Sequence, residues 1–220
     1  PIFISKDGKM QSGLFDENNS HQFATLDDLV AHMLQMTDDP LYPAGTNMVI
    51  YRGNPQAKLM IIGEAPGTEE NRQKKPFVGR SGQLLDQIMQ AVGFDTEKDV
   101  FITNAVFRLP PGVGGKPLRK PTSDEIAYYR PYLFEIIRLI DPVIMILTGN
   151  VATEAVLERT GITKLRGNWF EWHGRYCMPM FHPAYLLRNP SRKPGQPKSL
   201  TWQDIQNVRK KYDELMGSRS

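Results

Sequence analysis

The sequence predicts an α/β fold of three layers, α/β/α, around a central and mostly parallel sheet. Short buried apolar runs alternate along the chain with amphipathic helical patterns, which favours parallel strands joined by helices. The 220 residues suffice for one such domain, and 40% of them are hydrophobic, as is ordinary for a globular protein. There is no internal repeat and no break in composition, so we expect a polar, irregular segment at 1–20 and a single domain at 21–220.

Five segments carry helical signals. Thr25 is a candidate N-cap, with acidic residues in the turn after it, and the sequence from Thr122 to Glu125 is a capping box that begins a long helix. Gly93 and Gly161 are typical helix stops. The predicted helices cover residues 25–36, 81–92, 122–140, 150–160 and 199–216.

Six short runs are predicted strands: 48–51, 58–62, 100–103, 143–147, 169–172 and 175–180. The run at 58–62 breaks into a Gly/Pro-rich turn with one carboxylate, Glu64. Asn104 and His182 each follow the end of another predicted strand. The carboxyl ends of parallel strands meet at one edge of a sheet, so we expect these three polar side chains to share a pocket there.

The charge of the chain is unevenly distributed. Residues 1–45 carry a net charge of −5, whereas 46–220 carry +8, for a total of +3. Three segments, 72–80, 108–120 and 188–198, are rich in Lys and Arg and contain no acid. Phosphates are contacted mainly by Lys, Arg and backbone N–H groups, so this layout favours a nucleic-acid partner.

Several other function classes lack their motifs. The single cysteine, Cys177, excludes an internal disulfide framework and a cluster held by several thiolates, and the four histidines are well spread. Neither a phosphate-binding Gly-rich motif nor a Gly-x-Ser-x-Gly elbow is present. No apolar run approaches membrane-spanning length. We expect a cytoplasmic protein without a membrane partner, associated with the nucleoid if it is prokaryotic.

Four polar and aromatic residues near the predicted strand ends could recognise a base that is flipped out of DNA. Asn104 offers a donor and an acceptor together, which matches the O4/N3 edge of uracil. Phe77 can stack on the ring, His182 can stabilise negative charge on the uracil O2, and Glu64 can orient water or offset positive charge on the sugar. Each residue also has a purely structural alternative: Phe77 as part of the core, Asn104 as a turn residue and His182 as a histidine whose hydrogen bonds are satisfied within the protein.

Four sequence blocks stand out along the chain: Gly63-Glu-Ala-Pro-Gly67, Lys75-Pro-Phe-Val-Gly-Arg-Ser-Gly82, Thr103-Asn104 leading to Pro110-Pro111, and His182-Pro-Ala-Tyr-Leu-Leu-Arg188. Together they resemble the uracil-DNA glycosylase superfamily, and among its members the fourth family, usually an iron–sulfur protein. The likeness runs in order from about residue 25 to 215. It implies the three-layer fold of that superfamily and a monofunctional enzyme that hydrolyses the N-glycosidic bond of uracil in DNA, leaving an abasic site.

The resemblance also assigns site residues. It implies that uracil is bound by Gly63, Glu64, Ala65, Phe77, Asn104 and His182, with catalytic roles for Glu64, Asn104 and His182. Leu187 and Arg188 fall in the segment that fills the gap left by the flipped nucleotide. We expect DNA contacts from Arg80, Ser81, Lys116, Arg119, Lys120, Pro183, Ala184, Leu187 and Arg188.

The chain departs from the family pattern at the cluster. The four cluster cysteines are absent, and their places correspond to Met36, Asp39, Arg108 and Tyr129, none of which is an iron ligand of such clusters. We therefore expect no iron–sulfur cluster, no metal and no other cofactor.

Two further departures concern the reaction. The basic loop at 112–120 has no histidine of the kind that traps the sugar covalently in a related branch, so we expect turnover by water. Ala65 stands where the best-known branch has a water-activating Asp, so bond breaking is expected to depend on leaving-group stabilisation, with Glu64 assisting water.

Two other functions stay open. One is a non-catalytic or weakly catalytic binder of uracil-containing or abasic DNA. The other is a glycosylase for another deaminated base, against which the amide of Asn104 argues. For the glycosylase, the expected partners are DNA containing uracil and its abasic product, bound by a monomer.

Overall fold

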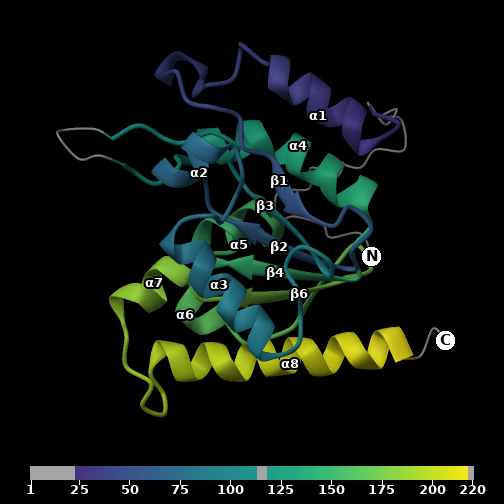
Figure 1. Ribbon diagram of the computed structural model, residues 1–220, viewed down its shortest axis with the longest axis vertical. Helices are drawn as coiled ribbons and strands as arrows, with labels where there is room; N and C mark the ends of the chain where they lie inside the picture. The colour runs from purple at the N-terminus through teal and green to yellow at the C-terminus, as the bar shows by residue number, and fades with distance from the viewer. Residues whose placement is uncertain (1–22, 113–117, 218–220) are drawn as a thin grey trace, which may run out of the picture.

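The computed structural model describes residues 23–112 and 118–217. Within them, six strands form one sheet in the order β1-β3-β2-β4-β6-β5 (Figure 1). The central four strands run parallel, and β1 and β5 pair antiparallel at the two edges. The strands are β1 (Tyr51–Gly53), β2 (Leu59–Gly63), β3 (Val100–Asn104), β4 (Ile144–Thr148), β5 (Phe170–Trp172) and β6 (Arg175–Met180).

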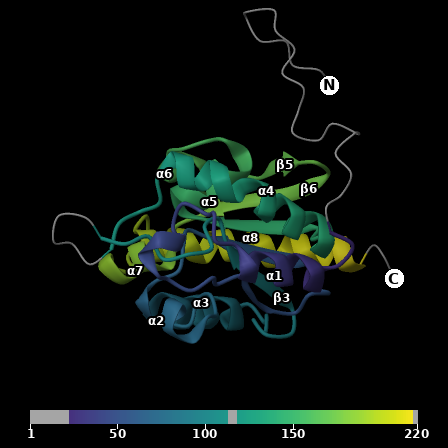
Figure 2. The ribbon, with the colours of Figure 1, turned by 90° about the horizontal axis from the view of Figure 1, so that it is seen from above.

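Helices cover both faces of the sheet. The helices are α1 (Leu26–Gln35), α2 (Thr68–Gln73), α3 (Arg80–Ala91), α4 (Ser123–Ile140), α5 (Gly149–Leu157), α6 (Ile162–Leu165), α7 (Pro183–Arg188) and α8 (Pro197–Gly217), with a 3₁₀ turn at Tyr42–Ala44. Figures 1 and 2 show α1 and α4 on one side of the sheet and α8 on the other.

The side chains of the central strands divide between two cores. Met60 and Ile62 of β2 pack with α1, α4 and α5, whereas Leu59 and Ile61 pack with α3 and α8. This alternation is the period of a strand buried on both faces. The predicted three-layer α/β/α fold with a mostly parallel sheet is therefore confirmed.

The predicted helix starts at Thr25 and Thr122 are also confirmed. The Thr25 hydroxyl accepts a hydrogen bond from the Asp28 N–H (3.1 Å), and the Asp28 carboxylate accepts one from the Thr25 N–H (3.2 Å). Thr122 and Glu125 form the same reciprocal pair, at 3.2 Å and 2.8 Å. Both boxes satisfy N–H groups that a helix leaves unpaired at its start.

Some elements were predicted wrongly or missed. The first strand is not at 48–51 but at Tyr51–Gly53, so the edge strand begins three residues later than predicted and includes Arg52. The helix predicted from Ser81 begins one residue earlier, at Arg80. The short helices α2, α6 and α7 have four to six residues, too few to show apolar periodicity. Among the described residues, no helix has the length and apolar character needed to cross a membrane.

Candidate active site

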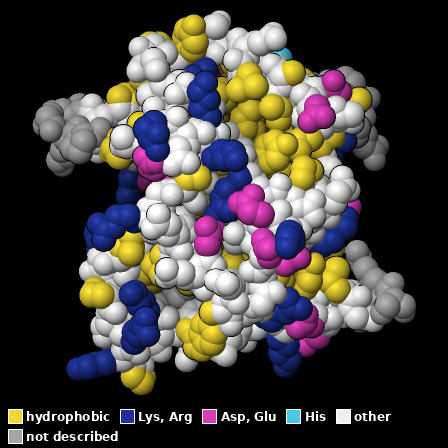
Figure 3. Space-filling model, in the orientation of Figure 1, with side chains coloured by type: hydrophobic (Ala, Val, Ile, Leu, Met, Phe, Trp, Pro, Cys, Tyr) yellow, Lys and Arg dark blue, Asp and Glu magenta, His cyan; other side chains and the backbone are white. Residues whose placement is uncertain are grey.

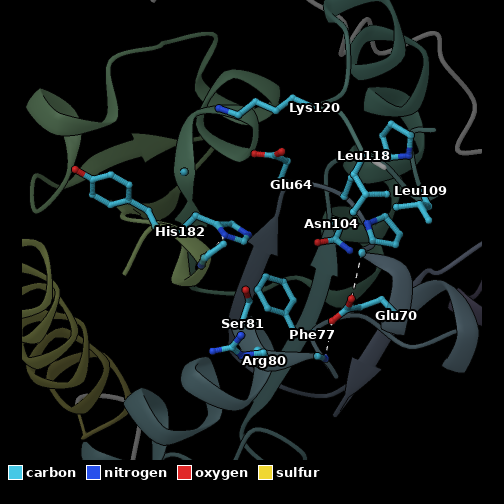
Figure 4. A pocket seen from close by; sticks show the side chains of 18 of the residues that line it. Glu64, Glu70, Phe77, Arg80, Ser81, Asn104, Leu109, Leu118, Lys120 and His182 are labelled. Carbon is cyan, nitrogen blue, oxygen red and sulfur yellow. Dashed lines mark hydrogen bonds between the residues drawn. The ribbon is translucent and has the colours of Figure 1, made fainter. Parts of the chain in front are cut away.

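A cavity of about 810 Å³ opens at the carboxyl ends of the parallel strands. Glu64 follows β2, Asn104 ends β3, and His182 lies two residues after β6. Phe77, from the loop before α3, completes the group (Figure 4). The structure therefore brings together the four side chains that the sequence singled out, at the edge of the sheet where they were expected.

Gly63 is the point on which two of these side chains converge. A Cβ atom at this position would lie 2.3 Å from the Asn104 Oδ1 and 2.5 Å from the ring of Phe77. Such distances exclude any side chain without displacement of both neighbours. The last residue of β2 is therefore a glycine because the pocket wall passes directly over its backbone.

Phe77 is both a core residue and a wall of the cavity. Its side chain is 6% exposed and belongs to the core cluster that contains Leu85. Its ring lies 5.9 Å from the ring of His182, between centroids, and lines the cavity. The core alternative is thus correct for one side of the ring, while the other side is available for a ligand.

Asn104 is buried, with 2% of the residue exposed. Among the described residues, its side-chain amide has no hydrogen-bond partner, and Figure 4 shows it directed into the cavity. Buried amides in folded proteins are nearly always paired. An unpaired one facing a cavity has the donor and acceptor needed to bind a ligand with a complementary edge.

His182 is held as a neutral imidazole. It caps α7, and its Nδ1 accepts a hydrogen bond from the Ala184 N–H at 3.2 Å, so the remaining proton is on Nε2. Burial, together with the charges of Arg188 and Lys120, lowers the pKa of His182 to about 4. Near pH 7 the residue is therefore an uncharged N–H donor at the wall of the cavity.

Glu64 is the carboxylate of the cavity. Burial raises its pKa above the ordinary value, while the positive charges of Lys120 and Arg188 act in the opposite direction. Figure 4 shows the carboxylate facing into the open space, with the Lys120 ammonium across from it. The site thus holds a partly buried acid next to two cations.

The residues predicted to contact DNA surround this cavity unevenly. Figure 3 shows Lys and Arg side chains along the side of the molecule where Figure 1 places α2 and α7. The cavity lining includes Arg80, Ser81, Arg119, Lys120, Ala184 and Arg188 but not Pro183, which is buried, or Leu187, which is partly buried. Lys116 lies outside the described residues.

Arg119 and Tyr185 differ from expectation. Arg119 donates two hydrogen bonds to the Glu125 carboxylate, at 2.7 Å and 2.6 Å, so its guanidinium is engaged inside the protein. Tyr185, which the sequence did not indicate, is 39% exposed and lines the cavity. Its position on the outer side of α7 had no signal in the sequence beyond its place in the fourth block.

The four residues that we expect at the places of the family's cluster cysteines lie together in the structure as a buried group, which we call the Asp39 brace: Met36, Asp39, Arg108 and Tyr129. The Asp39 carboxylate accepts hydrogen bonds from Arg108 Nε (2.8 Å), the Tyr129 hydroxyl (2.5 Å) and the Leu41 N–H (3.1 Å). Arg108 also donates to the carbonyl oxygen of Met36 at 3.1 Å.

This donor set does not fit an iron–sulfur cluster, which needs thiolates, because an arginine and a paired carboxylate occupy the place. Cys177 lies in the core on β6, where burial raises the pKa of its thiol to about 12. Within the described ranges, no three His, Cys, Asp or Glu residues are grouped to hold a metal.

The fold and the strand-end pocket are those of a known class, and the comparison of sequences agrees. The sequence model of the Uracil DNA glycosylase superfamily matches residues 50–206, and the chain belongs to that superfamily. Its relatives include several that are named as Type-4 members, in agreement with the likeness to the fourth family that the sequence blocks indicated.

Three of these relatives are each named Type-4 uracil-DNA glycosylase. The protein of Thermotoga maritima is 38% identical over 157 residues, 70% of this chain and 79% of the relative. That of Sulfurisphaera tokodaii is 37% identical over 161 residues, 69% of this chain and 70% of the relative. That of Archaeoglobus fulgidus is 29% identical over 204 residues, which is 89% of this chain and 95% of the relative.

Proposed function

We propose that this protein is a monofunctional uracil-DNA glycosylase that acts as a monomer on uracil-containing DNA, releasing uracil and leaving an abasic site. The observation that carries the proposal is the side-chain amide of Asn104, which has no hydrogen-bond partner among the described residues and faces the same cavity as the neutral histidine donor. Membership of the superfamily and the names of the Type-4 relatives support it.

Recognition of the base rests on Asn104 and Phe77. A uracil flipped out of the duplex places its ring on Phe77 and its O4/N3 edge against the amide. The amide nitrogen donates to O4 and the amide oxygen accepts from the N3–H. Cytosine presents an amino group and an unprotonated N3 at the same places, so both hydrogen bonds would be lost in this orientation of the amide. Discrimination against cytosine therefore requires the amide to keep this orientation when the base is bound.

Bond breaking is assigned to His182 and Glu64. As the bond between C1′ and N1 breaks, both electrons leave with the uracil, and the Nε2–H of His182 donates a hydrogen bond to the O2 that gains negative charge. Glu64 offsets the positive charge that develops on the sugar and orients the water that attacks C1′. The proton of that water passes to the carboxylate or to solvent.

The basic residues at the rim hold the DNA. Arg80 and Lys120 are exposed around the cavity and are assigned to phosphates. Leu187 and Arg188 remain the predicted wedge into the duplex. No step of this mechanism uses a metal ion.

The test is cleavage of an oligonucleotide with a single uracil by metal-free protein in EDTA, read after alkaline cleavage of the abasic product. We expect cleavage by the wild type and a loss on the order of 100-fold to 1000-fold in His182→Ala, because a donor to the developing anion is removed. Asn104→Asp should lose activity on uracil, because a carboxylate cannot donate to O4, and should gain activity on cytosine, whose 4-amino group can donate to the carboxylate.

His32→Ala, a change at an exposed histidine on α1, is the matched control and should retain wild-type activity. No cleavage by the wild type, combined with tight binding to abasic DNA, would reject the proposal in favour of a lesion-binding protein on a glycosylase fold.

A further inference from the structure

We infer that Glu70 and Arg52 are positioning residues that clamp the loop carrying Phe77 from two sides and so set the wall of the base pocket. The loop comprises residues 76–79, and we call it the Phe77 loop. The clamp itself is a property of the structure. Its effect on uracil excision rests on the proposed function.

The Phe77 loop has a backbone conformation that needs support. Phe77 has a φ of +54°, in the left-handed region that a phenylalanine rarely adopts. Such a conformation costs free energy and persists only where the surrounding structure holds it. Without that support, the backbone of Phe77 would relax and its ring would leave the cavity.

Glu70, on α2, holds the loop through its backbone N–H groups. Its Oε1 accepts hydrogen bonds from the Val78 N–H at 3.0 Å and the Gly79 N–H at 2.7 Å. Its Oε2 accepts one from the Gly67 N–H at 3.2 Å (Figure 4). One partly buried carboxylate thus ties the turn that carries Glu64 to the loop that carries Phe77.

Arg52, on the edge strand β1, holds the same loop through its carbonyl groups. Its Nε donates to the carbonyl oxygen of Pro76 at 3.0 Å, and one terminal nitrogen donates to that of Phe77 at 3.3 Å. The guanidinium is nearly inaccessible, with 6% of the side chain exposed. Its remaining N–H groups pair with the side chains of Asp86, Thr96 and Glu97.

The two residues therefore act on opposite sides of one strained peptide segment. Glu70 accepts from the N–H groups after Phe77, and Arg52 donates to the carbonyl groups at and before it. Gly82 of α3 packs directly against the backbone of Phe77, since a Cβ at this glycine would lie 1.8 Å from the Phe77 carbonyl oxygen. The ring is thereby fixed against Gly63 and Asn104.

The first experiment is a double-mutant cycle between the clamp and the residue it positions. Glu70→Gln keeps the size of the side chain but replaces an acceptor with a donor that faces backbone N–H groups. We expect the single-turnover rate at saturating enzyme to fall about tenfold, while the Kd for DNA, set mainly by phosphate contacts, stays unchanged. Phe77→Ala should cost on the order of 10-fold to 100-fold.

The cycle separates positioning from general damage. If Glu70 acts through Phe77, the variant carrying both changes cleaves at the rate of Phe77→Ala alone. Rates that multiply, or a loss that follows the unfolded fraction, would overturn the inference. Arg52→Lys, which keeps the charge but not the fork, should show the same non-additivity. Glu171→Gln on the opposite edge strand, β5, is the control and should cleave as the wild type does.

Hydrogen exchange of the backbone amides tests the clamp independently of uracil cleavage. The amides of Val78 and Gly79 should exchange about tenfold faster in Glu70→Ala than in the wild type. A glutamine can keep its one oxygen on these two N–H groups, so the result that would reject the clamp is equal exchange in Glu70→Ala and the wild type. A wild type that does not cleave uracil DNA but loses this protection in Glu70→Ala would reject the proposed function while leaving the clamp intact.

Discussion

The pocket and the Asp39 brace both bury polar side chains, but they differ in how those side chains are paired. Asp39 accepts three hydrogen bonds from within the protein, two of them from Arg108 and Tyr129. In the pocket, the amide of Asn104 has no partner among the described residues, and the Nε2 of His182 faces the cavity. The protein thus satisfies the polar groups of one region and leaves those of the other for a ligand.

This difference separates structural from functional polar groups. A paired buried carboxylate stabilises the contact between segments, here the stretch after α1, the segment after β3, and α4. The Asn104 amide has no protein partner within the described residues but opens onto the cavity, so water or a ligand can pair with it. Changes in the brace should therefore act on stability, whereas changes in the pocket should act on cleavage.

The largest expected effect is on stability, in the brace. Asp39→Asn keeps the shape of the side chain but leaves the buried Arg108 without its anionic partner, so we expect the free energy of unfolding to fall by about 3–5 kcal/mol. Urea unfolding measures this, with Asp27→Asn, an exposed change on α1, as the control. The cleavage rate per folded molecule should stay unchanged. If the fully folded variant cleaved much more slowly than the wild type, the brace would also be needed to position the residues of the pocket.

The converse change is in the pocket. In Gly63→Ala the new methyl group displaces the Asn104 amide and the Phe77 ring, both of which can move without unfolding the sheet. Misplacement of such groups by about 1 Å can cost on the order of 100-fold in rate, and we expect kcat/KM to fall by that order. The free energy of unfolding should change less than in Asp39→Asn. Near-normal cleavage would show that the two side chains do not read the base.

Glu64→Gln should raise the stability of the protein and lower its cleavage rate. Burial raises the pKa of Glu64 in the folded protein, so the folded state binds this proton more tightly than the unfolded state. Its contribution to stability is present at low pH and is lost as the pH rises through the raised pKa. Removing the ionisable group should therefore stabilise the protein at pH 7 and flatten the decline above about pH 4.5.

The same variant should cleave on the order of tenfold more slowly, because the charge opposite the sugar is lost. Unfolding curves at several pH values and cleavage assays on the same preparations measure both effects. A wild-type rate would remove Glu64 from the chemistry, whatever its effect on stability.

Local signals in the sequence were sufficient for most of the fold. The capping boxes at Thr25 and Thr122 and the buried apolar runs depend on neighbours within a few residues, and the structure confirms them. The strand ends placed Glu64, Asn104 and His182 on one edge for the same reason. What these residues do to a substrate stays a prediction.

Long-range pairing could not be predicted. Arg52 lies just outside the predicted strand 48–51, and its hydrogen-bond partners are 24 to 45 residues away, so its role had no local signal. Glu70 stands in a polar stretch that indicates solvated charge, so its role as an acceptor for three backbone N–H groups had no local signal. The Asp39 brace joins residues 69 and 90 positions apart, which no periodicity records.

The smallest expected effect distinguishes two adjacent cations at the rim. Lys120 is exposed and faces the open cavity, whereas Arg119 is bound by Glu125. A phosphate contact contributes about 0.9 to the slope of log K against log salt concentration. Lys120→Gln should therefore lower the magnitude of that slope for DNA binding by about one, and Arg119→Gln should leave the slope unchanged while lowering stability. Binding titrations across a salt series measure the slopes. If instead Arg119→Gln lowered the slope and Lys120→Gln did not, DNA would displace Glu125 from Arg119. The residues around the cavity would then rearrange on binding, unlike those of the brace.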